Sequence, residues 1–253
     1  MRLLARSSVD ELFDLRGKRV IVTGAARGNG RAIADGFAAA GCRVFYVDRM
    51  FAEDSSSYEP IIGHTEIGAD ITDQDALADL MRIAGDVDVL VNNAGITLSG
   101  KQQGQDSWAE TLAVNLTGAF RITELVIDGM KRSGGGSIIN ITSMSAHLGS
   151  AGNPAYHASK GGLSQLTKGL AAELGGDNIR VNNVCPGYIR TDMTKDSFAN
   201  NERRDFISNR TMLGRWGEPD DLQGACLFLA SSASSYITGS DIYVDGGLIN
   251  KGL

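Results

Sequence analysis

The 253-residue chain is poor in the residues that mark several protein classes. It has only three cysteines, Cys42, Cys185 and Cys226, whose odd number and wide spacing exclude a disulfide framework and a paired zinc-ligand motif. No apolar run approaches the roughly 18–20 residues of a membrane span. The net charge is −6, with no basic stripe for nucleic acid. We therefore expect a cytoplasmic protein with buried free thiols and with neither a membrane nor a nucleic-acid partner.

Histidine and proline are also scarce. The three histidines, His64, His147 and His157, lack the spacing of metal ligands, and no Gly-x-Ser-x-Gly elbow supports a hydrolase. The 32 glycines cluster at the ends of apolar segments instead of forming a repeat, which excludes collagen-like and linker sequences. The sequence therefore predicts a globular protein without a metal site.

Short apolar segments alternate with amphipathic segments along the chain. The predicted strands cover residues 19–23, 43–47, 65–69, 87–91, 137–142, 179–184 and 241–244. The predicted helices cover residues 28–40, 74–84, 107–132, 154–174 and 220–230. This alternation is typical of a parallel sheet with helices on both faces. We expect an α/β fold in which residues 1–253 form a single doubly wound Rossmann-type domain with about seven strands. An N-terminal arm (1–14) and a mobile helical flap (192–215) complete the prediction.

The turn after the first predicted strand has the pattern of a dinucleotide site. Gly24, Gly28 and Gly30 allow a tight turn and a close approach to a ligand, and the helix that follows offers free N–H groups to a pyrophosphate. Asp48 ends the next predicted strand, where a carboxylate can accept hydrogen bonds from the ribose hydroxyls. Together these features predict a nucleotide site.

Tyr156 and Lys160 are four residues apart and therefore share one face of a helix. A lysine ammonium beside a phenol lowers the pKa of the phenol, so Tyr156 is a candidate acid or base near neutral pH. The same spacing occurs on many helix surfaces without a function. Asn92 and Asn93 are likewise compatible with bracing a turn, and Asn115 with a satisfied core amide.

These residues occur in the order and spacing of a known family. The motifs are Thr23-Gly24-x-x-x-Gly28-x-Gly30, Asn92-Asn93-Ala94-Gly95, Asn115, Ser143, Tyr156-x-x-x-Lys160, Pro186-Gly187 and Thr191. From about Leu15 to Gly247 the chain resembles a short-chain dehydrogenase/reductase. Each motif is weak alone, whereas their joint order across the chain is specific.

The resemblance implies four catalytic residues. Tyr156 would exchange a proton with the substrate oxygen, while Lys160 would lower the pKa of Tyr156 and hold the nicotinamide ribose. Ser143 would polarise the substrate oxygen through a hydrogen bond. Asn115 would order a water that connects Lys160 to solvent. The hydride would pass between the substrate carbon and the nicotinamide.

The resemblance also implies a nicotinamide cofactor. Asp48 would repel a 2′-phosphate and favours NAD, whereas Arg27 or Arg49 would pair with that phosphate and favour NADP. NAD is preferred because Asp48 stands where the phosphate would lie. Asn29 replaces the aliphatic residue usual in the family. The predicted cofactor-binding residues are Gly24, Arg27, Gly28, Asn29, Gly30, Asp48, Arg49, Asp70, Ile71, Asn93, Ala94, Gly95, Tyr156, Lys160, Pro186, Gly187, Ile189 and Thr191.

Position in the chain predicts a polar substrate pocket, lined by Ser145, His147, Asn153 and Tyr188 below the flap. This set favours a secondary alcohol or ketone on a polyol, sugar or hydroxy acid, although His147 is equally compatible with a solvated loop.

Two alternative functions stay open. One is an NADPH-dependent 3-oxoacyl thioester reductase, and the other is a catalytically silent cofactor-binding scaffold. The resemblance further implies a homo-oligomer, either a tetramer or a dimer, in which the predicted helices from Ser107 and from Pro154 form the interface.

Overall fold

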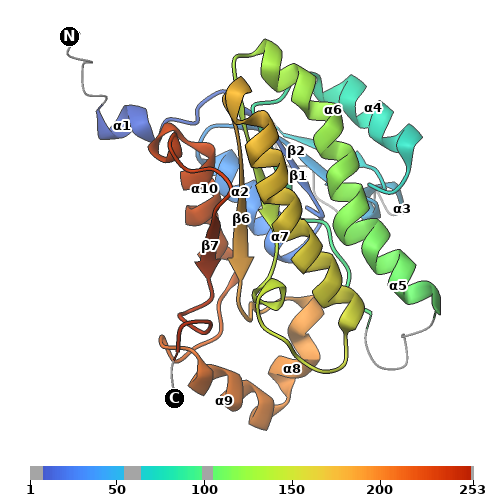
Figure 1. Ribbon diagram of the computed structural model, residues 1–253, viewed down its shortest axis with the longest axis vertical. Helices are drawn as coiled ribbons and strands as arrows, with labels where there is room; N and C mark the ends of the chain where they lie inside the picture. Colours follow the sequence, from blue (N-terminus) through green and yellow to red (C-terminus); the bar gives the residue numbers. More distant parts are fainter. Residues whose placement is uncertain (1–7, 54–63, 99–104, 252–253) are drawn as a thin grey trace.

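The computed structural model describes residues 8–53, 64–98 and 105–251, and its centre is a parallel sheet (Figure 1). Seven strands lie in the order β3-β2-β1-β4-β5-β6-β7. Their bounds are β1 (Arg19–Thr23), β2 (Arg43–Asp48), β3 (Thr65–Gly68), β4 (Val89–Asn92), β5 (Gly136–Ile141), β6 (Ile179–Pro186) and β7 (Asp241–Val244). The strand order reverses between β1 and β4, which confirms the doubly wound Rossmann-type sheet.

Helices cover both faces of this sheet. Their bounds are α1 (Val9–Leu12), α2 (Gly28–Ala39), α3 (Met50–Glu53), α4 (Gln74–Ala84), α5 (Gln105–Leu112), α6 (Ala119–Arg132), α7 (Pro154–Leu174), α8 (Lys195–Ala199), α9 (Asn201–Arg210) and α10 (Gln223–Ala230). One hydrophobic core lies between the sheet and α2 with α10, and the other between the sheet and α4, α6 and α7. Within the described parts of the chain, no helix combines the length and the hydrophobicity needed to cross a bilayer.

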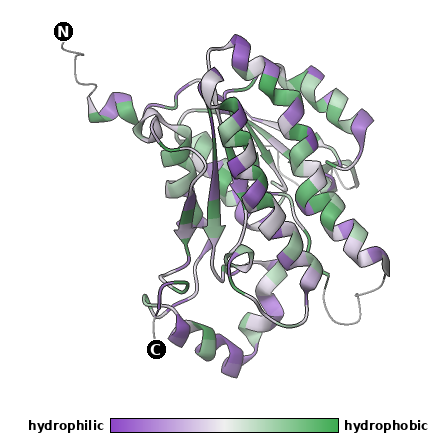
Figure 2. Cartoon of the chain, viewed as in Figure 1, coloured by the Kyte–Doolittle hydropathy of each residue, from purple (hydrophilic) through white to green (hydrophobic). Residues whose placement is uncertain are grey.

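The strands read as continuous apolar runs because both faces of the sheet are buried. On β1, Val20 and Val22 point into the core beside α2 and α10, while Ile21 points into the opposite core. All three side chains are fully buried. Hydrophobic residues accordingly predominate along the central strands, whereas α9 at the lower edge carries hydrophilic stretches (Figure 2).

The helix predicted over residues 107–132 is interrupted in its middle. A π-helical turn, Ala113–Gly118, separates α5 from α6. Asn115 lies in this turn, and its buried side-chain amide forms hydrogen bonds outside its own helix. Its Oδ1 accepts a hydrogen bond from the backbone N of Ile96 (2.8 Å), and its Nδ2 donates to the backbone O of the same residue (2.9 Å). The turn therefore brings Asn115 onto the segment that follows β4.

Three regions outside the predicted strands and long helices contain short helices. The flap comprises a 3-10 turn, Asp192–Thr194, followed by α8 and α9. The segment after β2 begins with α3, and residues 54–63 lie outside the described residues. In the predicted N-terminal arm, α1 is capped by Ser8, while residues 1–7 are likewise outside the described part.

A row of polar side chains crosses the buried sheet. Asn92, Asn140, Asn183 and Asp241 lie in matching register on β4, β5, β6 and β7. Asn92 donates to Asn140 (2.9 Å), and Asn183 donates to Asp241 (2.6 Å). Thr167 on α7 joins the two halves, accepting from Asn140 (2.7 Å) and donating to Asn183 (2.6 Å). Because all of these groups except Asp241 are buried, their hydrogen bonds hold the four strands in one register.

We expect Asn140→Ala to lower the free energy of unfolding by about 2–4 kcal/mol, because Asn92 and Thr167 each lose a buried hydrogen bond. Denaturation in urea, followed by circular dichroism, measures this change. The exposed Asn250 offers a matched control, and Asn250→Ala should stay within about 0.5 kcal/mol of the wild type. An equally small change for Asn140→Ala would show that the row does not stabilise the fold.

Candidate active site

The carboxyl edge of the sheet opens into a cavity of about 840 Å³. Ligands of open parallel sheets bind at this edge, where the strand order reverses. All the residues predicted to bind the cofactor line this cavity, and Ser143 lines it as well. The fold therefore brings the predicted nucleotide turn and three of the four predicted catalytic residues, Ser143, Tyr156 and Lys160, into one space.

The glycine turn leaves room for a diphosphate. Gly24 and Gly28 have positive φ angles of 68° and 56°, which favour glycine. A Cβ atom on Gly30 would overlap the carbonyl oxygen of Gly24 and the side-chain amide of Asn93. Helix α2 begins at Gly28, so its free N–H groups stand at the cavity. The turn thus fits an anionic group such as a pyrophosphate.

Thr23 and Asn93 brace the ends of β1 and β4 against each other. Thr23 Oγ1 accepts hydrogen bonds from the backbone N of Asn93 (3.0 Å) and of Ala94 (3.1 Å). The Asn93 side chain donates in return to the carbonyl oxygen of Thr23 (2.8 Å). This geometry supports the bracing interpretation of Asn93. It also gives Thr23 a role that its place in the motif did not indicate, because the role depends on which strands are neighbours.

Asp48 is held rigidly at the end of β2. Its two carboxylate oxygens accept hydrogen bonds from the backbone N of Ala26 and of Met50, each at 3.0 Å. Of the two possible partners of a 2′-phosphate, Arg49 lines the cavity, and Arg27 forms an ion pair with Asp192 (3.0 Å), which also lines it. The ribose end therefore presents a fixed carboxylate and an arginine that already has an anionic partner.

Lys160 is buried beneath the catalytic edge. Only 4% of the residue is exposed, and its Nζ donates to the carbonyl oxygen of Ile141 (2.7 Å). The ammonium lies 5.9 Å from the centre of the Tyr156 ring. Burial lowers the pKa of Lys160 to about 8, although the nearby Cys185 works in the opposite direction. Lys160 can therefore lose its charge in a range where most lysines keep it.

The start of α7 positions Tyr156. Asn153 caps this helix by accepting a hydrogen bond from the Tyr156 backbone N (3.2 Å), and Pro154 occupies the first turn. Burial raises the pKa of Tyr156, and a hydrogen bond with Ser143 partly opposes this rise. The prediction that the pKa of Tyr156 lies below its usual value is therefore wrong for the protein without a bound ligand. The physical reason is that desolvation of the phenolate outweighs its stabilising contacts.

Ser143 and Asn115 are also held in place. Ser143 Oγ accepts a hydrogen bond from the backbone N of Ser145 (3.0 Å), which orients the hydroxyl at the end of β5. Asn115 Oδ1 and Lys160 Nζ both lie beside Gly95, where a Cβ atom would be 3.3 Å from the oxygen and 3.6 Å from the nitrogen. Asn115 is thus close to Lys160 although it does not line the cavity itself.

The predicted substrate residues are not gathered around the catalytic group. None of the four lines the main cavity. Asn153 donates a hydrogen bond to Oγ1 of Thr97 (2.6 Å), which lines the cavity. The backbone N of Ser145 donates to Oγ of Ser143, which also lines it. Tyr188 lines a neighbouring cavity of about 440 Å³. His147 turns instead towards Asp241 on β7, at 3.4 Å.

Other residues complete the wall near the catalytic edge, and no sequence motif marks them. They are Thr97 and Leu98 after β4, and Met193 and Lys195 in the flap. Their contribution depends on how the two segments fold over the sheet edge. The helices expected to form an oligomer interface expose Trp108 on α5 and Leu125 on α6, and the oligomeric state stays a prediction.

Comparison with known proteins agrees with this geometry. A family model described as Enoyl-(Acyl carrier protein) reductase matches residues 24–249. Gluconate 5-dehydrogenase of Gluconobacter oxydans (strain 621H) is 36% identical over 249 residues, which cover 94% of this chain and 97% of that protein. The 3-oxoacyl-[acyl-carrier-protein] reductase FabG of Thermotoga maritima is 38% identical over 246 residues, which cover 93% of this chain and 99% of that protein.

A solved structure shares the whole fold. The crystal structure of a gluconate 5-dehydrogenase from Burkholderia cenocepacia J2315, in complex with NADP and tartrate, has a TM-score of 0.86 and 32% sequence identity, covering 96% of this chain and 99% of that chain. The motif order, the sheet and these matches show that the chain belongs to the short-chain dehydrogenase/reductase family and is an NAD(P)-dependent oxidoreductase acting on CH–OH and C=O groups.

Proposed function

We propose that this enzyme interconverts a secondary hydroxyl and a ketone on a sugar acid or a related hydroxy acid. The observation that carries the proposal is that Ser143, Tyr156 and Lys160 share one cavity with the nucleotide-binding turn. Relatives and a structural neighbour that act on gluconate support the substrate class. Because the reactive side chains are all in place, a silent scaffold is not proposed.

The proton chemistry follows from Tyr156 and Ser143. The cofactor, when bound, supplies or accepts the hydride. Because burial raises its pKa, Tyr156 holds its proton near neutral pH and can donate it to a developing alkoxide during reduction. For oxidation the phenol must first lose that proton, so the oxidation rate should rise with pH. Ser143 stands beside Tyr156 and can donate a hydrogen bond to the same substrate oxygen.

The cavity wall also suits an anionic substrate. Lys195 begins α8 and lines the cavity. Among the described residues, no ion pair engages this lysine, in contrast with Arg27, which is paired with Asp192. A free ammonium on the wall favours a carboxylate-bearing substrate over a neutral alcohol. Lys195 is therefore the residue proposed to recognise the acid group.

A second candidate is reduction of a 3-oxoacyl thioester with NADPH. It is favoured by the 38% identity to the Thermotoga maritima reductase, which slightly exceeds the 36% identity to the Gluconobacter oxydans enzyme. The two candidates share the same proton chemistry and differ in the substrate that the cavity accepts.

For the cofactor we propose a preference for NAD. The Asp48 carboxylate is anchored by two backbone N–H groups, so it cannot easily withdraw from a 2′-phosphate. NADP in the related Burkholderia cenocepacia structure favours the opposite choice, in which Arg49 on the cavity wall, or Arg27 after leaving Asp192, would pair with the 2′-phosphate. The balance between these effects is open to direct measurement.

A steady-state screen tests the function. Sugar acids, neutral polyols and a 3-oxoacyl thioester are assayed with NAD(H) and with NADP(H), following reduced nicotinamide absorbance. We expect kcat/KM for a sugar acid with NAD(H) to exceed that for the thioester by at least about tenfold. The protein prepared with Tyr156→Phe measures background from host enzymes. Preferred turnover of the thioester with NADPH would instead support the second candidate.

Asp48→Asn tests the proposed choice of cofactor. Removal of the negative charge should shift the ratio of kcat/KM for NAD over NADP towards NADP by at least about tenfold, or about 1.4 kcal/mol. Asp79→Asn, at an exposed carboxylate outside the cavity, is the control and should leave the ratio unchanged. A wild type that prefers NADP, together with an unaltered ratio in Asp48→Asn, would refute the role given to Asp48.

Tyr156→Phe tests the proton transfer. We expect kcat to fall by about 10²–10⁴-fold, and the rise of the oxidation rate with pH to disappear, because the proton acceptor is lost. Cofactor affinity, measured by fluorescence titration, should stay within about threefold of the wild type. Tyr236→Phe, at a fully exposed tyrosine, should behave as the wild type. Retained activity in Tyr156→Phe would exclude the mechanism.

A further inference from the structure

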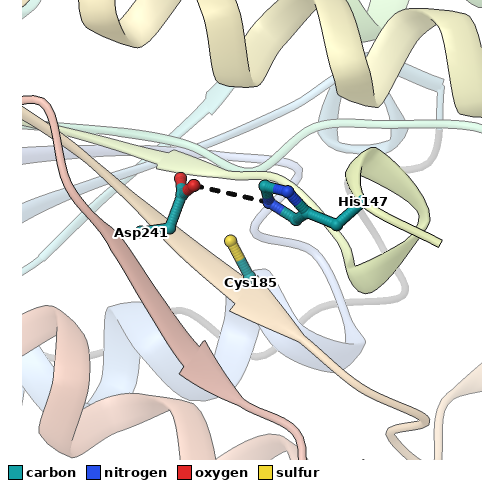
Figure 3. A group of neighbouring side chains, drawn as sticks. All are labelled: His147, Cys185 and Asp241. Carbon is teal, nitrogen blue, oxygen red and sulfur yellow. Dashed lines mark ion pairs between the residues drawn. The ribbon is translucent and has the colours of Figure 1, made fainter. Parts of the chain in front are cut away.

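We propose that His147, Cys185 and Asp241 form a binding site for a divalent ion of the Zn²⁺ type. The three side chains come from the turn after β5, from β6 and from β7, and they converge on one point (Figure 3). Their potential ligand atoms all lie within 4.8 Å of one another. Among the described residues, no other group of three or more histidine, cysteine or acidic side chains brings its ligand atoms together in this way.

The donor set selects the kind of ion. An imidazole nitrogen, a thiolate sulfur and a carboxylate oxygen suit Zn²⁺, whereas Mg²⁺ and Ca²⁺ require oxygen ligands. On binding, the Cys185 thiol gives its proton to solvent and the sulfur bonds the metal. The thiolate and the carboxylate then balance the charge of the ion, while His147 binds as the neutral imidazole. A neutral site of this kind tolerates a partly buried position.

The distance between the nitrogen and the oxygen ligand is close to that of a tetrahedral site, and the sulfur lies within 4.8 Å of both. His147 Nε2 and Asp241 Oδ2 are 3.4 Å apart, and bond lengths typical of zinc place such a nitrogen and oxygen about 3.3 Å apart. A nitrogen and a sulfur on the same ion would be about 3.6 Å apart. The His147 side chain is 24% exposed and the Asp241 side chain 16% exposed, so an ion can reach them from solvent. Cys185 is fully buried and closes the inner side.

Neighbouring groups already orient the ligands. Asp241 Oδ1 accepts a hydrogen bond from Asn183 (2.6 Å), which leaves Oδ2 directed at His147. Thr142 Oγ1 lies 2.9 Å from Cys185 Sγ. The His147 ring packs edge-on against Tyr243, with ring centres 5.4 Å apart. Such outer partners hold metal ligands in position and strengthen binding.

A simple ion pair between His147 and Asp241 does not explain the whole arrangement. The pair would be complete with any small residue at position 185, yet the buried thiol of Cys185 lies beside both groups (Figure 3). A bound ion would also link two segments of the active site. His147 belongs to the turn that begins at Ser143, and Cys185 precedes the Pro186-Gly187 turn of the cofactor cavity. Metal binding should therefore stabilise the catalytic edge.

Cobalt titration of the full-length protein without a histidine tag tests the site. After treatment with a chelator, we expect one Co²⁺ per chain, with a thiolate-to-cobalt charge-transfer band and the strong visible bands of a tetrahedral site. Zn²⁺ should displace the Co²⁺ and raise the melting temperature. Cys185→Ser should remove the charge-transfer band, whereas Cys42→Ser, at a buried free thiol outside the cluster, should retain it.

His147→Gln keeps the test decisive if Cys185→Ser fails to fold, because His147 lies on an exposed turn. Loss of this ligand should weaken binding of Co²⁺ and Zn²⁺ by at least about 100-fold, since even outer partners contribute about 10–100-fold. The proposal is overturned if the wild type shows no charge-transfer band. It is also overturned if His147→Gln binds as tightly as the wild type, or if only octahedral cobalt is found.

Discussion

The polar row across β4, β5, β6 and β7 is the constraint on which the catalytic edge depends. A slip of one residue in any of these strands would turn its side chains to the opposite face of the sheet. The hydrogen bonds from Asn92 through Asn140 and Thr167 to Asn183 would then be lost. The same register decides where β5 and β6 end, and so where Ser143 and the Pro186-Gly187 turn stand. Buried amides thus link the stability of the sheet to the geometry of the active site.

Burial changes the pKa values of the two reactive side chains on α7, Tyr156 and Lys160. Burial raises the pKa of Tyr156 and lowers that of Lys160 to about 8, so both side chains favour their neutral forms more than they would in water. Ser143 and the carbonyl oxygen of Ile141 offer the polar contacts that make such burial tolerable. Tyr156 therefore holds its proton near neutral pH and can donate it during reduction, whereas oxidation of a secondary alcohol is favoured by a higher pH.

The catalytic cavity and the proposed metal site are connected by neighbouring segments of the chain. The catalytic cavity opens beyond the ends of the strands, and the cluster of His147, Cys185 and Asp241 lies between β5, β6 and β7. Asp241 is both the last member of the polar row and a proposed metal ligand, so the register of the sheet also orients the second cluster. The turn that begins at Ser143 is common to both sites. Binding of a metal ion at His147, Cys185 and Asp241 would therefore stabilise the catalytic edge through this turn.

The family resemblance supplied the predicted cofactor residues, all of which line the cavity, whereas the sequence by itself determined the fold class and the order of the strands and helices along the chain. The reason is that hydrophobic periodicity and turn chemistry are local, and helix α4 and strand β7 have the predicted bounds. Only the tertiary structure decided the contacts of Asn115, the sign of the Tyr156 pKa shift and the lining of the substrate wall. These depend on which distant segments touch and on how deeply they are buried. The meeting of His147, Cys185 and Asp241 is the clearest case, because no spacing along the chain marks three ligands brought together by strand pairing.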